Sequence, residues 1–130
     1  MSYLFDASSI FEAIVRNKVE VLAGNYTVEL ARFELGNVLW KRRDCVNAEE
    51  YKRLASLVKR TLNLMEVLSI DCNEAEVAEL ADRLNITFYD ASYVFLAKSK
   101  NLSLVTEDKK LKSRVKGHIE ILSLNNLSFR

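Results

Sequence analysis

Short apolar runs alternate along the chain with longer segments in which apolar residues recur at helical spacing. The apolar runs predict strands at residues 3–5, 19–22, 102–105 and 119–122, while residues 67–70 fit either a strand or a helix exit. The helical spacing predicts helices over residues 7–16, 27–43, 48–66, 73–84, 90–101 and 107–115. Asn73 is expected to cap its helix, with Glu76 completing a capping box. Strands that alternate with helices are typical of an α/β domain with a parallel sheet.

The composition predicts one compact intracellular domain over residues 1–130. The chain has 130 residues, three glycines and no proline, so no flexible linker divides it. We find no signal peptide and no membrane span, and we expect a cytoplasmic protein. Cys45 and Cys72 lie in no CxxC or Cys/His cluster, which argues against zinc and predicts buried or half-buried reduced thiols. The net charge of +1 argues against binding to nucleic acid by charge alone, but it does not exclude nucleic acid as a substrate.

Three acids are expected at one edge of the predicted sheet. Asp6 directly follows the first strand, and Asp108 comes three residues after the strand at 102–105. Asp90 begins a helix that leads into that strand, so its end of the helix returns to the same edge. Ligand sites in open parallel sheets form outside the carboxyl ends of the strands. The topology therefore predicts that Asp6, Asp90 and Asp108 lie near one another.

A fourth acid, Glu34, is singled out by the helical wheel. At 100° per residue, its neighbours on the helix over 27–43 are Leu30, Ala31 and Val38, so it falls in the middle of an apolar face. A carboxylate buried without a partner is costly. Several carboxylates close together need a multivalent cation, and Mg²⁺ or Mn²⁺ with hard oxygen ligands meets that need.

Each acid also has an ordinary structural interpretation. Asp6 fits the cap of the helix that follows it. Asp90 and Asp108 fit helix-start acids that the macrodipole favours. Glu34 fits an inward salt bridge to Lys41 or Arg42.

Four segments carry a resemblance to a known family. They are LFDAS at 4–8, ELGNVLW at 34–40, YDASYVFLA at 89–97 and LVTEDKKL at 104–111. In their order and spacing they resemble a PIN domain, and they are most similar to the VapC-type ribonuclease toxins of bacterial and archaeal toxin–antitoxin pairs. The segments span almost the whole chain, although residues 44–86 contribute no motif.

The resemblance implies a three-layer α/β/α sandwich with a central, mainly parallel sheet of four to five short strands. It also implies a metal-dependent endoribonuclease that uses one or two Mg²⁺ or Mn²⁺ ions and leaves a 5′-phosphate and a 3′-hydroxyl. Asp6, Glu34, Asp90 and Asp108 carry over as the catalytic and metal-binding acids, and the last of these positions varies within the family. The lone histidine, His118, lies in a polar turn and is expected to be exposed rather than catalytic.

Polar and basic residues beside the acids are candidates for orienting a substrate. Ser8, Asn37 and Thr106 carry hydroxyl or amide groups that could orient a ligand, a water or a phosphate. Ser8 also fits a helix N-cap, and Thr106 fits a cap before Lys109. Two basic runs fit either solvated faces or contacts to the RNA backbone. These runs are Lys41, Arg42 and Arg43, and Lys109, Lys110, Lys112, Arg114 and Lys116.

The resemblance further implies an RNA substrate, a VapB-type antitoxin, a homodimer and no membrane partner. Most apolar residues of the helices over 27–43 and 48–66 are expected in the core: Phe33, Trp40, Tyr51, Leu54, Leu57, Val58 and Leu62. Two alternatives stay open, a PIN nuclease of RNA processing that is not a toxin, and a non-catalytic PIN-like module that binds RNA or protein. A phospho-acceptor receiver domain needs an acidic pair where Asp6 stands alone. A haloacid-dehalogenase-type phosphatase needs aspartate in place of Ser8, so both fit poorly.

Overall fold

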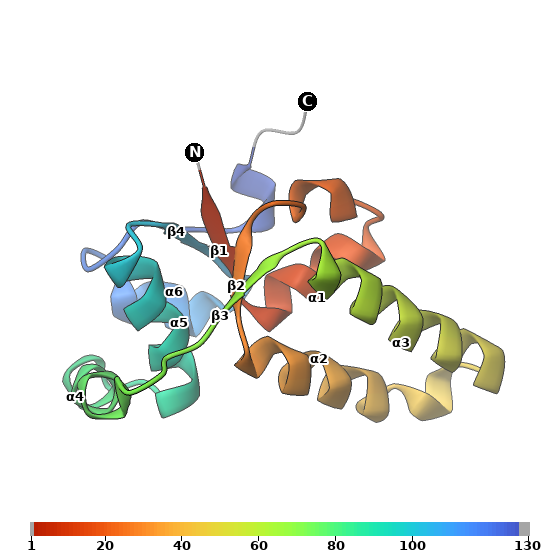
Figure 1. The fold of residues 1–130 in the computed structure, drawn as a ribbon, viewed down its shortest axis with the longest axis horizontal. Coiled ribbons are helices and arrows are strands. Elements are labelled where there is room, and N and C mark those ends of the chain that lie inside the picture. Colours follow the sequence, from red (N-terminus) through yellow and green to blue (C-terminus); the bar gives the residue numbers. More distant parts are fainter. Residues whose placement is uncertain (1, 128–130) are drawn as a thin grey trace.

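The computed structural model describes residues 2–127, in which five parallel strands form one sheet between two layers of helices (Figure 1). The strands are β1 (Tyr3–Phe5), β2 (Tyr26–Val28), β3 (Glu66–Leu68), β4 (Ser103–Val105) and β5 (Ile121–Leu122). The α-helices are α1 (Ala7–Val15), α2 (Leu30–Lys41), α3 (Ala48–Asn63), α4 (Glu74–Leu84), α5 (Phe88–Ser99) and α6 (Lys109–Val115). The 3₁₀ turns are η1 (Val19–Val21), η2 (Arg43–Cys45) and η3 (Leu124–Asn126). The predicted α/β sandwich is therefore confirmed.

The two faces of the sheet carry separate hydrophobic cores. Along β1 and β4, Phe5 and Val105 face the core covered by α1, α2 and α3, whereas Leu4 and Leu104 face the core covered by α4, α5 and α6. This alternation follows from the two-residue period of a strand. Because both faces are covered, successive residues of β1 and β4 are apolar, Leu4 and Phe5 in one strand and Leu104 and Val105 in the other, as is usual in parallel strands. Figure 1 shows α1 to α3 on one side of the strands and α4 to α6 on the other.

The strand order puts the switch point of the sheet between β1 and β4. The order across the sheet is β3-β2-β1-β4-β5, so the chain winds one way from β1 to β3 and then returns to the other side of β1. Such a reversal opens a crevice outside the carboxyl ends of the two strands at the switch point. Leu4 pairs with Leu104, and Phe5 pairs with Val105, so these two strands end side by side.

The second strand lies later in the chain than the sequence pattern predicts. Residues 19–22 form the 3₁₀ turn η1 instead of a strand, and β2 occupies the start of the segment predicted as the helix over 27–43. Gly24 has a φ of +76°, which turns the chain, and Asn25 then accepts a hydrogen bond from the Tyr3 backbone at 3.0 Å. The Thr27 hydroxyl donates to the Phe5 carbonyl at 2.7 Å, which ties β2 to β1.

Several helix ends also differ from the sequence expectation. The capping box at Asn73 does not form, because the Asn73 amide donates to the Asp71 carbonyl at 3.1 Å and no side-chain cap bond is made. The helix predicted from Asp90 begins two residues earlier, where Thr87 caps α5, and the helix predicted from residue 107 begins at Lys109. Cys45 and Cys72 are exposed rather than buried, since both lie in surface turns. Within residues 2–127, no helix combines the length and the apolar character needed to cross a bilayer.

Candidate active site

Asp6 is a buried acid that hydrogen-bonds both the start of α1 and the loop after β4. It caps α1, where its Oδ1 accepts the Ser9 backbone N–H at 3.0 Å and the Ser8 hydroxyl at 2.7 Å. Its Oδ2 accepts the Thr106 hydroxyl. Burial raises the pKa of the Asp6 carboxyl above its ordinary value, although the hydrogen bonds from Thr106 and its neighbours act in the opposite direction. The capping interpretation of Asp6 is correct, and it coexists with a place in the crevice between β1 and β4.

Ser8 and Thr106 join the start of α1 to the loop after β4. Each hydroxyl donates to Asp6 and accepts a backbone N–H from the loop: Ser8 from Glu107 at 3.0 Å, and Thr106 from Asp108 at 3.1 Å. Their own oxygens lie 3.3 Å apart. Neither residue is a helix cap, because Asp6 caps α1 and Asp108 caps α6. Both hydroxyls therefore orient the Asp6 carboxylate.

Glu34 reaches the same edge from α2 and is held by a tyrosine. Ala31, Leu35 and Leu39 are the buried residues of α2, so half-buried Glu34 flanks the apolar face instead of lying at its centre. Its Oε1 accepts the hydroxyl of Tyr93 from α5 at 2.5 Å. The alternative salt bridge to Arg42 does not form, because the Arg42 guanidinium lies over the Phe11 ring at 4.8 Å.

Asp90 and Asp108 share a hollow. The hollow has a volume of about 230 Å³ and is lined by both acids and by Thr87, Lys110 and Arg114, among others. Asp90 lies in the first turn of α5, and Asp108 caps α6 by accepting the Lys110 and Leu111 backbone N–H groups at 2.9 and 3.1 Å. Both acids thus have the helix-start role as well as a shared position.

The negative charges of three of the four acids raise the pKa of a neighbouring acid. Burial raises the pKa of Glu34, and the charges of Asp6 and Asp90 raise it further, while the Tyr93 hydrogen bond opposes this. Burial also raises the pKa of Asp90, and the charge of Asp108 adds to the effect. The two ion pairs found among residues 2–127, Arg16 with Glu12 and Arg32 with Glu29, involve none of the four. Mutual repulsion at this edge is therefore not relieved by those cations.

The four acids do not surround a single point in the structure. Over residues 2–127, no three Asp, Glu, His or Cys side chains come close enough together to ligate a metal ion. The donors themselves, carboxylate oxygens from four elements, are of the hard type that Mg²⁺ and Mn²⁺ prefer. Like-charged carboxylates that lie close together are stabilised by a shared proton or by a cation. The donor chemistry of the four acids fits a divalent cation.

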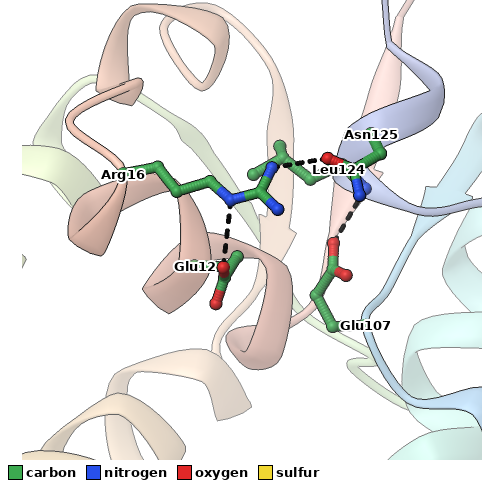
Figure 2. A network of polar contacts seen from close by, with 5 residues as sticks. All are labelled: Glu12, Arg16, Glu107, Leu124 and Asn125. Atoms are coloured by element: carbon green, nitrogen blue, oxygen red, sulfur yellow. Dashed lines mark hydrogen bonds and ion pairs between the residues drawn. The ribbon is translucent and has the colours of Figure 1, made fainter.

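Glu107 belongs to the same loop, but its carboxylate serves a structural contact. Figure 2 shows it accepting the Leu124 backbone N–H, at 2.8 Å, from the C-terminal turn η3. The next residue, Asn125, accepts the Arg16 guanidinium at 2.6 Å, and Arg16 also pairs with Glu12 at 3.0 Å. The turn η3 thereby connects the end of α1 with the loop that carries Thr106 and Asp108. Sequence reasoning gave Glu107 no such role.

The basic residues divide between two surfaces. Lys110 and Arg114 line the hollow of Asp90 and Asp108, whereas Lys109, Lys112 and Lys116 line a separate hollow of about 450 Å³ beside Ile121. This split follows from the helical spacing of α6.

The other polar candidates are exposed. Asn37 and Lys41 lie exposed on α2, and Arg43 lies over the Trp40 ring at 3.9 Å. His118 is exposed, as expected. Tyr93 was not among the predicted site residues, because its spacing on an apolar helix is that of a core residue.

A family model described as the PIN domain matches residues 1–116. Exonuclease VapC9 from Pyrobaculum aerophilum is 32% identical over 132 aligned residues, which cover 95% of this chain and 93% of that protein. Ribonuclease VapC3 from the same organism is 31% identical over 88 residues, covering 66% of this chain and 67% of that protein.

Solved structures show the same fold. A crystal structure of a Pyrobaculum aerophilum protein superposes with a TM-score of 0.81 at 29% identity, covering 96% of this chain and 85% of that one. VapBC2 from Rickettsia felis, bound to a DNA fragment from its promoter, matches with a TM-score of 0.70 at 18% identity, covering 95% and 98%. The fold is that of an α/β domain whose parallel sheet carries acids after β1 and after β4. The chain belongs to the PIN domain family and is related to the VapC toxins.

Proposed function

We propose that this protein is a metal-dependent endoribonuclease that hydrolyses RNA phosphodiester bonds as the toxin of a VapBC-type pair. The observation that carries the proposal is a set of contacts that link the four acids. Thr106 hydrogen-bonds both Asp6 and the Asp108 backbone, Asp90 and Asp108 line one hollow, and Glu34 contacts Tyr93 of the helix that carries Asp90. Three of the four have raised pKa values. Burial raises the pKa of Asp6, Glu34 and Asp90, and the charges of neighbouring acids raise the pKa of Glu34 and Asp90 further. Groups perturbed in this way are typical of functional sites.

The four acids are the proposed ligands of one or two Mg²⁺ or Mn²⁺ ions. When bound, such an ion lowers the pKa of a water molecule and neutralises charge on the phosphate. Ser8 and Thr106 hold Asp6 in one orientation through both carboxylate oxygens. Asp108 is held by the first backbone N–H groups of α6. The chain thus fixes its ligands before the substrate arrives, which avoids reorganisation during the reaction.

Basic groups beside the acids are proposed to hold the RNA backbone. Lys110 and Arg114 line the hollow of Asp90 and Asp108, so they lie where a phosphate next to the cleaved bond would pass. Arg114 also donates to the Asn85 carbonyl at 2.5 Å, which fixes its guanidinium. Contacts of this kind position RNA without reading its sequence. Of the remaining sequence candidates, Asn37 stays a proposal for orienting a ligand, a water or a phosphate. Lys41, Arg42 and Arg43 stay proposals for contacts to the RNA backbone, whereas Lys109 and Lys112 line the separate hollow of α6.

An antitoxin is the proposed protein partner. Structural neighbours include a toxin–antitoxin complex from Klebsiella pneumoniae and VapBC from Salmonella typhimurium bound to DNA. On α2, Phe33 and Trp40 are 74% and 52% exposed, against the expectation that they belong to the core. Val58 and Leu62 are buried as expected, and Tyr51, Leu54 and Leu57 are half-buried. Large exposed apolar side chains on one helix favour a protein partner. A homodimer is proposed from the family resemblance alone.

RNA cleavage by the purified chain tests the proposal. We expect single-stranded RNA to be cut with Mg²⁺ or Mn²⁺, to survive in EDTA, and to survive with Asp6→Asn or Asp90→Asn. Asp82→Asn, which changes an exposed acid on α4, is the matched control and retains activity. Equal cleavage by the wild type and both site variants would show that Asp6 and Asp90 are not catalytic residues. No cleavage by the wild type would favour the non-catalytic binding module.

The same assay separates endonuclease from exonuclease action. VapC9 is named an exonuclease, which favours an exonuclease as the second candidate. A circular RNA has no ends, so only an endonuclease linearises it. Co-expression with any small protein encoded by the neighbouring reading frame then distinguishes a toxin, whose growth arrest such a protein relieves, from a nuclease of RNA processing.

A further inference from the structure

Tyr93 contacts one of the four acids, and it is not among the residues predicted for the site. It is on α5, three residues after Asp90, and is 1% exposed. Its hydroxyl lies 2.5 Å from Oε1 of Glu34, which is 59 residues away in the sequence. The Tyr93 ring packs in the core of α4, α5 and α6, whereas the buried residues of α2 pack in the opposite core. This hydrogen bond therefore joins the two helical layers at the catalytic edge of the sheet.

The four acids differ in how their carboxylates are held. Asp6 accepts four hydrogen bonds from Ser8, Ser9 and Thr106, and Asp108 accepts two backbone N–H groups of α6. Glu34 has one more methylene than either, and therefore more rotamers to restrict. The hydrogen bond that the structure gives its carboxylate comes from Tyr93. Loss of this contact would leave the Glu34 carboxylate without the hydrogen bond that holds Oε1.

Tyr93 is suited to act as a permanent donor. Burial and the nearby Glu34 charge both raise the pKa of the phenol well above its ordinary value, so the hydroxyl keeps its proton. A buried tyrosine hydroxyl needs a hydrogen-bond partner, and here the acceptor is a charged oxygen, which makes a stronger bond than a neutral one.

We propose that Tyr93 is a positioning residue that holds Oε1 of Glu34 and so fixes the carboxylate that would bind the cation. The inference rests on the proposed metal-dependent function. In this role Tyr93 would act only through Glu34. Residues that orient a metal ligand in this way typically contribute about 10- to 100-fold in metal affinity or activity.

The test is a double-mutant cycle read by Mn²⁺ binding. Full-length wild type, Tyr93→Phe, Glu34→Gln and the double variant are titrated with Mn²⁺ by calorimetry. Tyr93→Phe removes one oxygen and keeps the ring, so thermal unfolding is followed only to confirm that each variant folds. Tyr51→Phe, which removes the same atom from a half-buried tyrosine of α3, is the matched control.

We expect Tyr93→Phe to weaken Mn²⁺ binding by about tenfold, the lower end of the range for such residues, and Tyr51→Phe to leave it unchanged. In the Glu34→Gln background, Tyr93→Phe has no further effect, because the carboxylate it orients is gone. RNA cleavage by Tyr93→Phe falls in kcat with little change in KM.

Two outcomes overturn the inference on its own. One is wild-type Mn²⁺ affinity in Tyr93→Phe, and the other is an equal loss with and without the Glu34 carboxylate, which would assign Tyr93 a general packing role. A wild-type chain that neither binds Mn²⁺ nor cleaves RNA overturns the proposed function, and the role of Tyr93 falls with it. The wild-type titration therefore separates the two failures.

Discussion

The hydroxyl of Thr106 donates to the carboxylate of Asp6 across 100 residues of sequence. The two residues follow β1 and β4, which lie side by side, so the hydrogen bond spans the switch point of the sheet. Because Asp6 is buried and its pKa is raised, its ionised form depends on such donors. The strand order that puts β1 beside β4 therefore also brings the Thr106 hydroxyl to the Asp6 carboxylate.

Removal of the Thr106 hydroxyl is expected to impair both stability and cleavage. Thr106→Val keeps the shape of the side chain but leaves Asp6 Oδ2 and the Asp108 backbone N–H without their partner. Loss of a hydrogen bond to a charged group costs about 1.5–3 kcal/mol, which urea unfolding would measure. Thr106→Ser retains the hydroxyl and is the matched control. If valine and serine behaved alike, the hydrogen bond would not matter for either property.

The raised pKa values predict how stability changes with pH. Asp6, Glu34 and Asp90 bind protons more tightly in the folded chain than in the unfolded one. Their contribution to the free energy of unfolding is therefore most favourable below the ordinary carboxyl values of 3.8 and 4.5, and it falls as pH rises through the raised values. Asp6→Asn removes one of these groups. We expect urea unfolding between about pH 4 and pH 8 to show a smaller decline for Asp6→Asn than for wild type. An equal or steeper decline in the variant would contradict the raised pKa of Asp6.

Divalent cations are expected to stabilise the folded chain through the acids. A ligand that binds only the folded state at about 100 times its Kd adds about 2.7 kcal/mol, so Mn²⁺ should raise Tm. Asp90→Asn should lose most of this increase, because it removes one ligand, whereas the exposed Asp82→Asn on α4 should keep it. A similar increase in all three proteins would indicate that Mn²⁺ binds elsewhere.

Glu107 is expected to matter for folding of the C-terminal turn rather than for metal binding. Its carboxylate accepts the Leu124 backbone N–H of η3 (Figure 2). Glu107→Ala should cost about 1–3 kcal/mol, since it leaves a partly buried donor without its acceptor. Hydrogen exchange at Leu124 should then become faster, with Mn²⁺ affinity unchanged. Glu29→Ala, which removes an exposed partner of Arg32, should cost less than about 1 kcal/mol. A loss of Mn²⁺ affinity in Glu107→Ala would instead make Glu107 part of the metal site.

The sequence predicted the sheet edge well, because three acids follow directly from strand and helix ends. Asp6, Asp90 and Asp108 were placed by topology. In the structure Asp90 and Asp108 line one hollow, and Thr106 links Asp6 to the Asp108 backbone. The position of β2 was wrong, because Tyr26–Val28 is only three residues long and runs into a helical pattern. Gly24 and Asn25 were the available signal, since they form the turn that precedes it.

Contacts between distant side chains could not be predicted from periodicity. Tyr93 has the spacing of a core residue, and its ring is indeed buried, so nothing in the pattern indicates that its hydroxyl meets Glu34. The division of the basic residues of α6 between two surfaces could not be predicted for a different reason. The run of lysines reads as one patch in sequence, but successive positions of a helix point in different directions. Only the neighbouring elements decide which lysines share a surface with the acids.

That split gives a prediction for RNA binding. Lys110 lines the hollow of Asp90 and Asp108, whereas Lys112 lines the separate hollow beside Ile121. We expect Lys110→Ala to weaken binding of single-stranded RNA and to reduce the slope of log K against log salt by about 0.7, the value for one phosphate contact. Lys112→Ala is the matched control and should leave both unchanged. Fluorescence anisotropy in the Asp6→Asn background keeps the RNA intact during the measurement. Equal losses in the two lysine variants would mean that the RNA crosses both surfaces of α6, and that the acidic crevice does not define its path.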